Sequence, residues 1–209
     1  MTDQPGYDAL AQRYAETFPT PFTSPLEQHA LEVFIDAVAS ASPRPVVVDV
    51  GCGIGHVATF LNERGLTVIA IDPSAQMLRI GSAKHPHIDF DHGDAALIGR
   101  DLSEVDALLA RFSLIHLPPD EVRAVLTQWH RRLPSHAVLL VATQGSDDPG
   151  VHEFDHAVAP AWRWHADALA EALKSAGFTE TWRTISRPGP GHRFPEIHIL
   201  ASVSLPAPT

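Results

Sequence analysis

Three glycines alternate with other residues directly after a run of valines, and this stretch has the clearest chemical meaning in the chain. The glycines are Gly51, Gly53 and Gly55, and Asp49 stands inside the end of the valine run. Alternate glycines remove Cβ atoms where a backbone turns tightly and approaches a ligand closely. The pattern predicts a strand, a glycine turn and a helix, with backbone N–H groups gathered at the tip. We expect a ligand site there.

Two kinds of ligand commonly use such a tip. A dinucleotide fingerprint that starts at Gly51 needs its third glycine at position 56, which is His56. The Asp49 carboxylate would also repel a pyrophosphate, whereas it would accept hydrogen bonds from an amino-bearing ligand. The stretch from Pro45 to Arg64 resembles motif I of the class I S-adenosylmethionine-dependent methyltransferases, in which an acidic residue precedes G-x-G-x-G. A nicotinamide-dependent oxidoreductase and a module that binds S-adenosylmethionine without turnover remain the alternatives.

The resemblance implies a site for S-adenosylmethionine at the ends of consecutive strands. Asp72 follows a predicted strand over 66–71 and lies 21 residues after Gly51, where an acidic residue can accept both ribose hydroxyls. The segment from Asp72 to Leu78 resembles the D-x-S-x-x-M-L segment of the family, which implies that Asp94 and Ala95 meet the adenine. The expected cofactor residues are Tyr14, Asp49, Gly51, Cys52, Gly53, Asp72, Pro73, Asp94, Ala95 and Arg111.

Three histidines are candidates for the general base, because imidazole titrates near neutral pH. They are His116, His152 and His156. His116 belongs to the run from Phe112 to Pro119, which resembles a segment that leads into the active-site mouth of small bacterial methyltransferases. The alternative for His116 is a cap on the helix that begins at Pro119. The spacings around His152 and His156 match no closed zinc pattern, so we expect no metal.

The acceptor site is expected in a polar loop over 144–164, because loops after strand ends hold ligands in open α/β sheets. Within it, residues 154–164 resemble a flap of the same small methyltransferases. The expected substrate residues are Gln144, Glu153, Arg163, Trp164 and Arg193. For Trp164 a place in the hydrophobic core is an equal alternative.

The remaining patterns place these residues on one α/β domain over 1–209. Two helices are expected before the first strand, the second with Ser24 as N-cap and Glu27 completing a capping box. We divide the domain into cap helices (1–44), a cofactor-binding core (45–143), the substrate loop (144–164) and a C-terminal helix with an antiparallel strand pair (165–205). The resemblance implies a Rossmann-like, doubly wound sheet of seven strands.

Composition excludes several classes of function. The formal net charge of −10 argues against a nucleic-acid partner, which needs a basic face. Cys52 is the single cysteine, so no intrachain disulfide forms, which fits a reducing cytoplasm. No apolar run approaches the roughly 20 residues of a membrane span. We expect a cytoplasmic monomer or homodimer, without a membrane partner, that methylates a hydroxyl of a metabolite, natural product or sugar.

Overall fold

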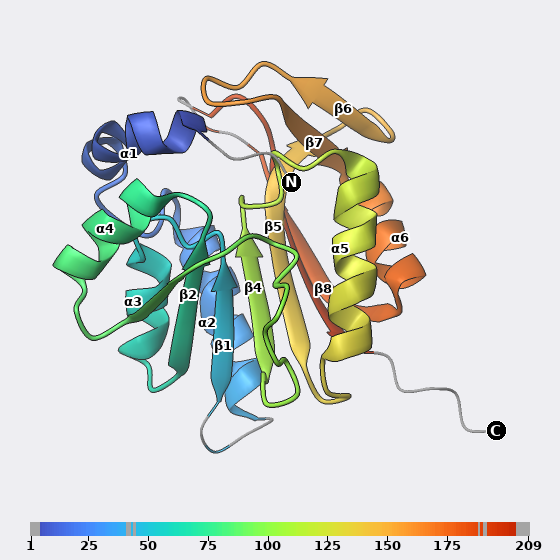
Figure 1. Ribbon diagram of the computed structural model, residues 1–209. Helices are drawn as coiled ribbons and strands as arrows, with labels where there is room; N and C mark the ends of the chain where they lie inside the picture. Colours follow the sequence, from blue (N-terminus) through green and yellow to red (C-terminus); the bar gives the residue numbers. More distant parts are fainter. Residues whose placement is uncertain (1–4, 41–42, 44, 188, 190–191, 204–209) are drawn as a thin grey trace.

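The computed structural model describes residues 5–40, 43, 45–187, 189 and 192–203. Figure 1 shows a twisted central sheet with helices on both faces and two further segments above its upper edge. The first four residues of the expected cap, most of the linker before residue 45 and the tail after residue 203 lie outside the described residues. Within the described ranges no helix is long and apolar enough to cross a membrane.

Two helices precede the sheet, as the sequence predicts. Helix α1 spans Pro5–Thr17 and α2 spans Pro25–Ala39. Ser24 caps α2, and its hydroxyl accepts a hydrogen bond from the backbone N–H of Glu27. The Glu27 carboxylate, however, accepts from the backbone N–H of Thr23 instead of that of Ser24. The capping box is therefore half formed, because the other Glu27 oxygen is taken by an ion pair with Arg111.

Strands and helices alternate through the cofactor-binding core. They are β1 (Val46–Val50), α3 (His56–Asn62), β2 (Thr67–Asp72), α4 (Ala75–Lys84), β3 (Asp89–His92), β4 (Ala107–Arg111), α5 (Pro119–Arg132) and β5 (Val138–Ser146). The order across the sheet is β3-β2-β1-β4-β5, and all of these neighbours are parallel. The carboxyl ends of β1, β2, β3 and β4 therefore meet at one edge, the edge where open α/β sheets bind ligands.

The C-terminal part closes the sheet with antiparallel strands. Helix α6 (Ala166–Ala176) leads into β8 (Phe178–Ser186), which pairs with β9 (Glu196–Val203). Strand β9 inserts between β8 and β5 and runs antiparallel to both. This arrangement confirms the expected α/β fold with a terminal antiparallel pair.

The segment expected as a loop over 144–164 contains two strands. Strand β6 (Val151–Phe154) and β7 (Ala161–His165) form an antiparallel hairpin, and β7 also pairs with Gly145 and Ser146 at the extended end of β5. The described sheet thus has nine strands instead of seven. The polar composition of the segment hid a period-two pattern, in which Val151 and Trp164 pack on the core and His152 and Arg163 face away.

Apolar side chains fill both faces of the sheet. On one face α5 and α6 pack over Trp129, Trp164 and Phe178, and on the other α2 and α3 pack over Phe34 and Leu61. Trp164 is only 2% exposed. Of the two sequence-based interpretations of this tryptophan, the core is the one that the structure shows.

Candidate active site

The glycine turn at the end of β1 adopts the left-handed backbone that favours glycine at all three positions. The φ angles are +73° at Gly51, +57° at Gly53 and +79° at Gly55. A Cβ at Gly51 would lie 2.2 Å from Cβ of Ser113, and one at Gly55 would lie 2.3 Å from the Phe90 ring. A Cβ at Gly53 would meet only Tyr14, at 3.9 Å. Gly51 and Gly55 thus serve packing, whereas Gly53 faces open space beneath Tyr14.

Asp49 is a buried carboxyl group whose hydrogen-bonding capacity is not used within the described part of the chain. It is 3% exposed, and its Oδ2 atom has no hydrogen-bond partner there. Burial raises the pKa of Asp49 to about 7, although the nearby Arg111 guanidinium opposes that shift. A carboxyl group in this state is suited to receive an amino group, since a cation with N–H donors would restore the ionised form.

Asp72 closes the glycine turn from the neighbouring strand. Its Oδ2 atom accepts from the backbone N–H of Gly53 at 2.8 Å, and its Oδ1 atom accepts from that of Ser74 at 2.8 Å. Burial nevertheless raises the pKa of Asp72. Because each carboxylate oxygen has more than one lone pair, both can accept a further hydrogen bond from a ligand.

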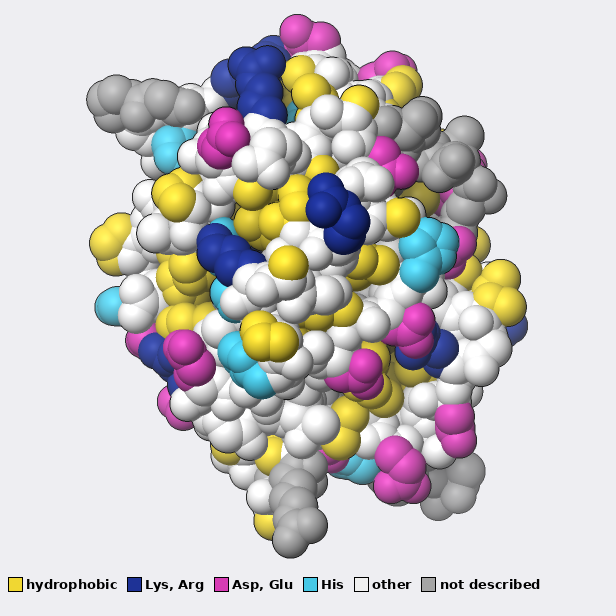
Figure 2. Space-filling view, turned by 60° about the vertical axis from the view of Figure 1, so that its left-hand side comes forward, with side chains coloured by type: hydrophobic (Ala, Val, Ile, Leu, Met, Phe, Trp, Pro, Cys, Tyr) yellow, Lys and Arg dark blue, Asp and Glu magenta, His cyan; other side chains and the backbone are white. Residues whose placement is uncertain are grey.

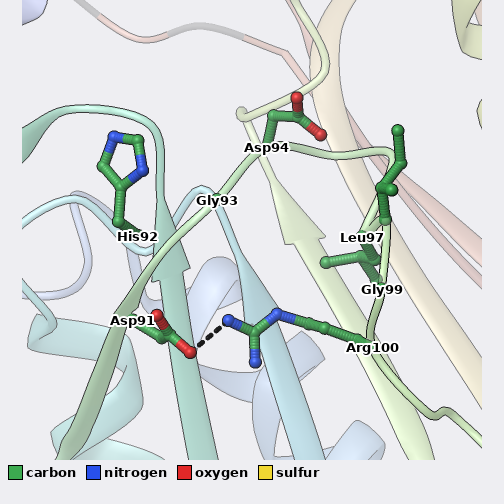
Figure 3. Close-up of a pocket in the computed structure, with 8 residues that line it drawn as sticks. Asp91, His92, Gly93, Asp94, Leu97, Gly99 and Arg100 are labelled. Carbon is green, nitrogen blue, oxygen red and sulfur yellow. Dashed lines mark ion pairs between the residues drawn. The ribbon is translucent and has the colours of Figure 1, made fainter.

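A loop after β3 forms one wall of a hollow of about 370 Å³, shown in Figure 3. Asp94 lies at the head of this loop and accepts from the backbone N–H of Ala96 at 2.9 Å. The Arg132 side chain, from the last turn of α5, donates to the carbonyl oxygens of Ala96, Leu97 and Arg100. These bonds hold the loop in one conformation, in which Asp94 lines the hollow.

Helix α1 covers this edge of the sheet (Figure 1). The Asp8 carboxylate accepts from the Ser74 hydroxyl at 2.6 Å and from the backbone N–H of Gln76 at 3.0 Å, which fastens α1 to the start of α4. Tyr7 and Tyr14 lie on the inner side of the helix, with their ring centroids 6.4 Å apart. Tyr14 lies over the turn at Gly53, where an added Cβ would be 3.9 Å from its ring.

His116 follows β4 in the chain and lies next to Tyr7, near the amino-terminal end of α1. Its Nδ1 atom is 2.9 Å from the carbonyl oxygen of Pro160, and its Nε2 atom is 3.0 Å from the Tyr7 hydroxyl. The ring also contacts that of His156, with centroids 4.8 Å apart. Helix α5 has no side-chain cap, so the structure does not support the alternative that His116 caps it. Burial lowers the pKa of both histidines.

The other expected acceptor residues are spread over the hairpin and the end of β5. His152 is directly opposite Arg163 in the β6–β7 pair, and its Nε2 atom meets the carbonyl oxygen of Pro149, away from the His116 cluster. Glu153 lines a second hollow with Phe154, Asp155, His156 and Pro160. Gln144 pairs with Glu196 in the β5–β9 register, and Arg193 is bound to Asp155.

A family model described as a methyltransferase domain matches residues 47–136 of the chain. A demethylmenaquinone methyltransferase of Renibacterium salmoninarum is 38% identical over 80 residues, which are 38% of this chain and 33% of the relative. A magnesium-protoporphyrin O-methyltransferase of Rhodobacter capsulatus is 34% identical over 101 residues, which are 46% of this chain and 44% of the relative. The region that the family model matches contains the glycine turn and the strands β2, β3 and β4 that follow it.

Residues 47–136 are thus similar to the methyltransferase domains of the class I S-adenosylmethionine-dependent family. The matched regions span less than half of both relatives. Solved structures show the fold over nearly the whole chain. Magnesium protoporphyrin IX methyltransferase from Synechocystis PCC 6803 superposes with a TM-score of 0.72 at 17% identity, covering 98% of both chains. The 1,6-didemethyltoxoflavin-N1-methyltransferase of Burkholderia thailandensis gives 0.68 at 20% identity, covering 98% of this chain and 92% of that one.

Within this methyltransferase fold the predicted cofactor residues gather at one edge of the sheet, but not all present side chains to it. Cys52 contributes its backbone, and burial raises the pKa of its thiol. Pro73 contributes its carbonyl oxygen, which is 3.0 Å from Nε2 of His92. The Arg111 guanidinium turns toward α2, where it binds Glu27 and the carbonyl oxygen of Pro21.

Sequence reasoning missed a buried polar group around Arg111. Glu27, Glu196 and His198 are each no more than 8% exposed and lie near the Arg111 guanidinium. His198 has no hydrogen-bond partner for either ring nitrogen among the described residues. The only advance signal was Glu27 in its capping position. Over the described ranges no group of three metal-binding side chains occurs.

Proposed function

We propose that this protein transfers a methyl group from S-adenosylmethionine to a hydroxyl oxygen of a small molecule. The observation that carries the proposal is the buried Asp49 carboxyl group with an unused Oδ2 atom, beside a glycine turn whose open side is Gly53. An amino-acid end with a protonated amine would supply the missing donor. Asp72 and Asp94, at the ends of the next strands, would then bind the nucleoside end of the same cofactor.

The residues at the sheet edge fit such a cofactor in order. Asp49 would hold the amino group, and the backbone of Gly51, Cys52 and Gly53 would approach the amino-acid end closely. Asp72 would accept from the ribose hydroxyls while it keeps its bonds to Gly53 and Ser74. Asp94 and Ala95 would meet the adenine, because they lie at the head of the loop that borders the 370 Å³ hollow.

When bound, S-adenosylmethionine supplies a methyl group that is already activated on a sulfonium ion. The task of the protein is therefore mainly to align the acceptor atom with the methyl group, which can lower the barrier by several kcal/mol. Helix α1 lies over the glycine turn through Tyr14, and this cover would exclude water from the reacting atoms. A hydroxyl acceptor also has to lose its proton, so the site needs a base near the methyl group.

His116 is our choice for this base, because its tautomer follows from its two partners. The carbonyl oxygen of Pro160 can only accept, so Nδ1 of His116 carries the hydrogen. In the neutral ring Nε2 then holds the free lone pair, and the Tyr7 hydroxyl donates to it. Burial lowers the pKa of His116, which keeps the ring neutral and able to accept a proton. An acceptor hydroxyl that takes the place of Tyr7 would meet this lone pair.

We propose a small-molecule acceptor rather than a nucleic acid, because a polyanion binds to a positively charged face and the chain as a whole is negatively charged. The formal net charge is −10. Figure 2 shows one face, on which Lys and Arg side chains are scattered among Asp and Glu. The relatives' names include methyltransferases of demethylmenaquinone, magnesium-protoporphyrin and indolepyruvate, so they do not select one acceptor atom.

Two measurements test the proposal. Calorimetry should show micromolar binding of S-adenosylhomocysteine and no comparable binding of NAD; tighter binding of NAD would refute it. Methyl transfer to a panel of phenols, sugars and amines should then reveal turnover. In the variant His116→Asn turnover should fall by about 10²–10⁴, far more than the cofactor affinity changes. Cofactor binding without transfer to any acceptor would favour a non-catalytic binding module.

A further inference from the structure

Arg163 is an arginine of the β6–β7 hairpin with no acidic partner in the part of the chain that the structure describes. Its Nη1 atom donates to the Ser146 hydroxyl at 3.1 Å, and its Nε atom is buried without a hydrogen-bond partner. Arg193, which lies close by in the fold, differs in this respect, since it is bound to the Asp155 carboxylate at 2.6 Å. Within the described ranges the Arg163 guanidinium therefore forms no ion pair.

The guanidinium of Arg163 is nevertheless held in place. It lies 4.9 Å from the centroid of the Phe194 ring, and the guanidinium of Arg193 lies at the same distance from that ring. Stacking and the bond to Ser146 orient the group, while its Nε–H stays unused. A buried donor without a partner is unfavourable, so an acceptor brought by a ligand would be bound strongly there.

A continuous row of rings connects this charge to the base. Phe194 contacts Phe154 at 5.0 Å between centroids, Phe154 contacts His156 at 5.9 Å, and His156 contacts His116 at 4.8 Å. The backbone N–H of Trp162 donates to the carbonyl oxygen of Ile115 at 2.8 Å, and this bond ties the hairpin to the segment that carries His116. A hollow of about 480 Å³ lies at the His156 end of this row and is lined by Glu153, Phe154, Asp155, His156 and Pro160; the Asp155 carboxylate is paired with Arg193.

We propose that the methyl acceptor is a planar aromatic molecule that carries a carboxylate group, and that Arg163 binds this carboxylate. The planar fork of a guanidinium matches a carboxylate with two parallel N–H···O bonds. Phe154 and Phe194 would contact the aromatic ring, and the hydroxyl to be methylated would lie toward His116. This inference rests on the function proposed above and names the substrate class of that site.

The test compares two aromatic acids with their neutral amides of equal size. The probes are 4-hydroxybenzoate against 4-hydroxybenzamide, and 6-hydroxy-2-naphthoate against its amide, titrated by calorimetry into protein saturated with S-adenosylhomocysteine. The wild-type protein should bind at least one acid about tenfold or more tightly than its amide, the effect of hydrogen bonds to a charged group. Arg163→Gln should abolish this preference and leave the affinity for the amide unchanged.

Two further variants make the result specific. Arg123→Gln is the matched control, because Arg123 stacks on Trp164 of the same hairpin but already pairs with Asp120; it should keep the preference for the acid. Arg163→Lys keeps the charge without the fork and should retain part of the preference, and it serves as the readout if Arg163→Gln does not fold.

Three results would overturn the inference. They are equal affinity for acid and amide in the wild type, a preference that survives in Arg163→Gln, and no binding of either acid up to about 10 mM, well beyond the range of useful recognition. Failure of S-adenosylhomocysteine to bind in the first titration would instead refute the proposed function. The two failures are therefore distinguishable.

Discussion

Lowering the pH from 7.5 to 6.0 should weaken the binding of S-adenosylhomocysteine, because Asp49 must lose its proton to receive the ligand's amino group. In the free protein burial raises the pKa of Asp49 to about 7. If only the ionised form binds, the apparent dissociation constant scales as one plus ten to the power of the pKa minus the pH. The affinity should therefore fall about eightfold across this interval.

Isothermal titration calorimetry at several pH values measures this effect, and the variant Asp49→Asn isolates its source. The amide cannot ionise, so the variant should bind more weakly at pH 7.5 and show little pH dependence down to 6.0. The ligand's own amino group stays mainly protonated over this interval and does not produce the slope. An unchanged affinity in the wild type, or the same slope in Asp49→Asn, would refute the assignment of Asp49 to the amino group.

Asp49 also makes a prediction for the protein without ligand. Its folded-state pKa lies above its unfolded value, so its contribution to stability is fully present below the unfolded pKa and is lost as the pH rises through about 7. At pH 8 the free energy of unfolding of the ligand-free protein should therefore be higher for Asp49→Asn than for the wild type. Urea unfolding at pH 8 tests this, and a less stable variant would contradict it.

Three other predictions concern residues away from Asp49. Asp72→Ala should weaken cofactor binding by about 1.5–3 kcal/mol per lost hydrogen bond, and more than it lowers the free energy of unfolding; unchanged affinity in a folded variant would remove Asp72 from the ribose. Burial lowers the pKa of His198 to about 4, below the value of 6.5 in the unfolded chain. The contribution of the neutral ring to the free energy of unfolding is therefore present above pH 6.5 and is lost as the pH falls toward 4. Between pH 7 and 5 the wild type should lose about 2 kcal/mol more than His198→Leu in urea unfolding, and equal losses would contradict this. Hydrogen exchange should show amides of residues 144–164 that become protected when S-adenosylhomocysteine and an acceptor bind, whereas equal protection in both states would indicate a fixed segment.

Local chemistry made the cofactor-binding core predictable from the sequence. The valines of β1, the glycines after it and Asp72 at the end of β2 each carry a signal within a few residues of one another. The doubly wound sheet with a terminal antiparallel pair followed from the resemblance. The helix start at Ser24 was equally clear, because an N-cap depends on its immediate neighbours.

The features that were missed depend on residues far apart in the chain. The ion pair of Glu27 with Arg111 joins positions 84 residues apart, and no spacing rule reports it. The β6–β7 hairpin was read as a loop, because its strands have only four and five residues, the surrounding segment is polar, and the pairing of β7 with β5 is tertiary. The sequence named His116 as a candidate base. It gave no sign of the contact with Tyr7, which lies 109 residues earlier in the chain.

Helix α1 is fastened at two places that serve different ligands. Asp8 holds it at the start of α4, beside the proposed ribose site, and Tyr7 holds it at His116, beside the proposed acceptor site. A ligand that changes one of these contacts shifts α1 and so alters the free energy of the other contact. We therefore expect the binding of cofactor and acceptor to be thermodynamically coupled through α1. Such coupling is reciprocal: if the cofactor raises the affinity for the acceptor, the acceptor raises that for the cofactor by the same factor.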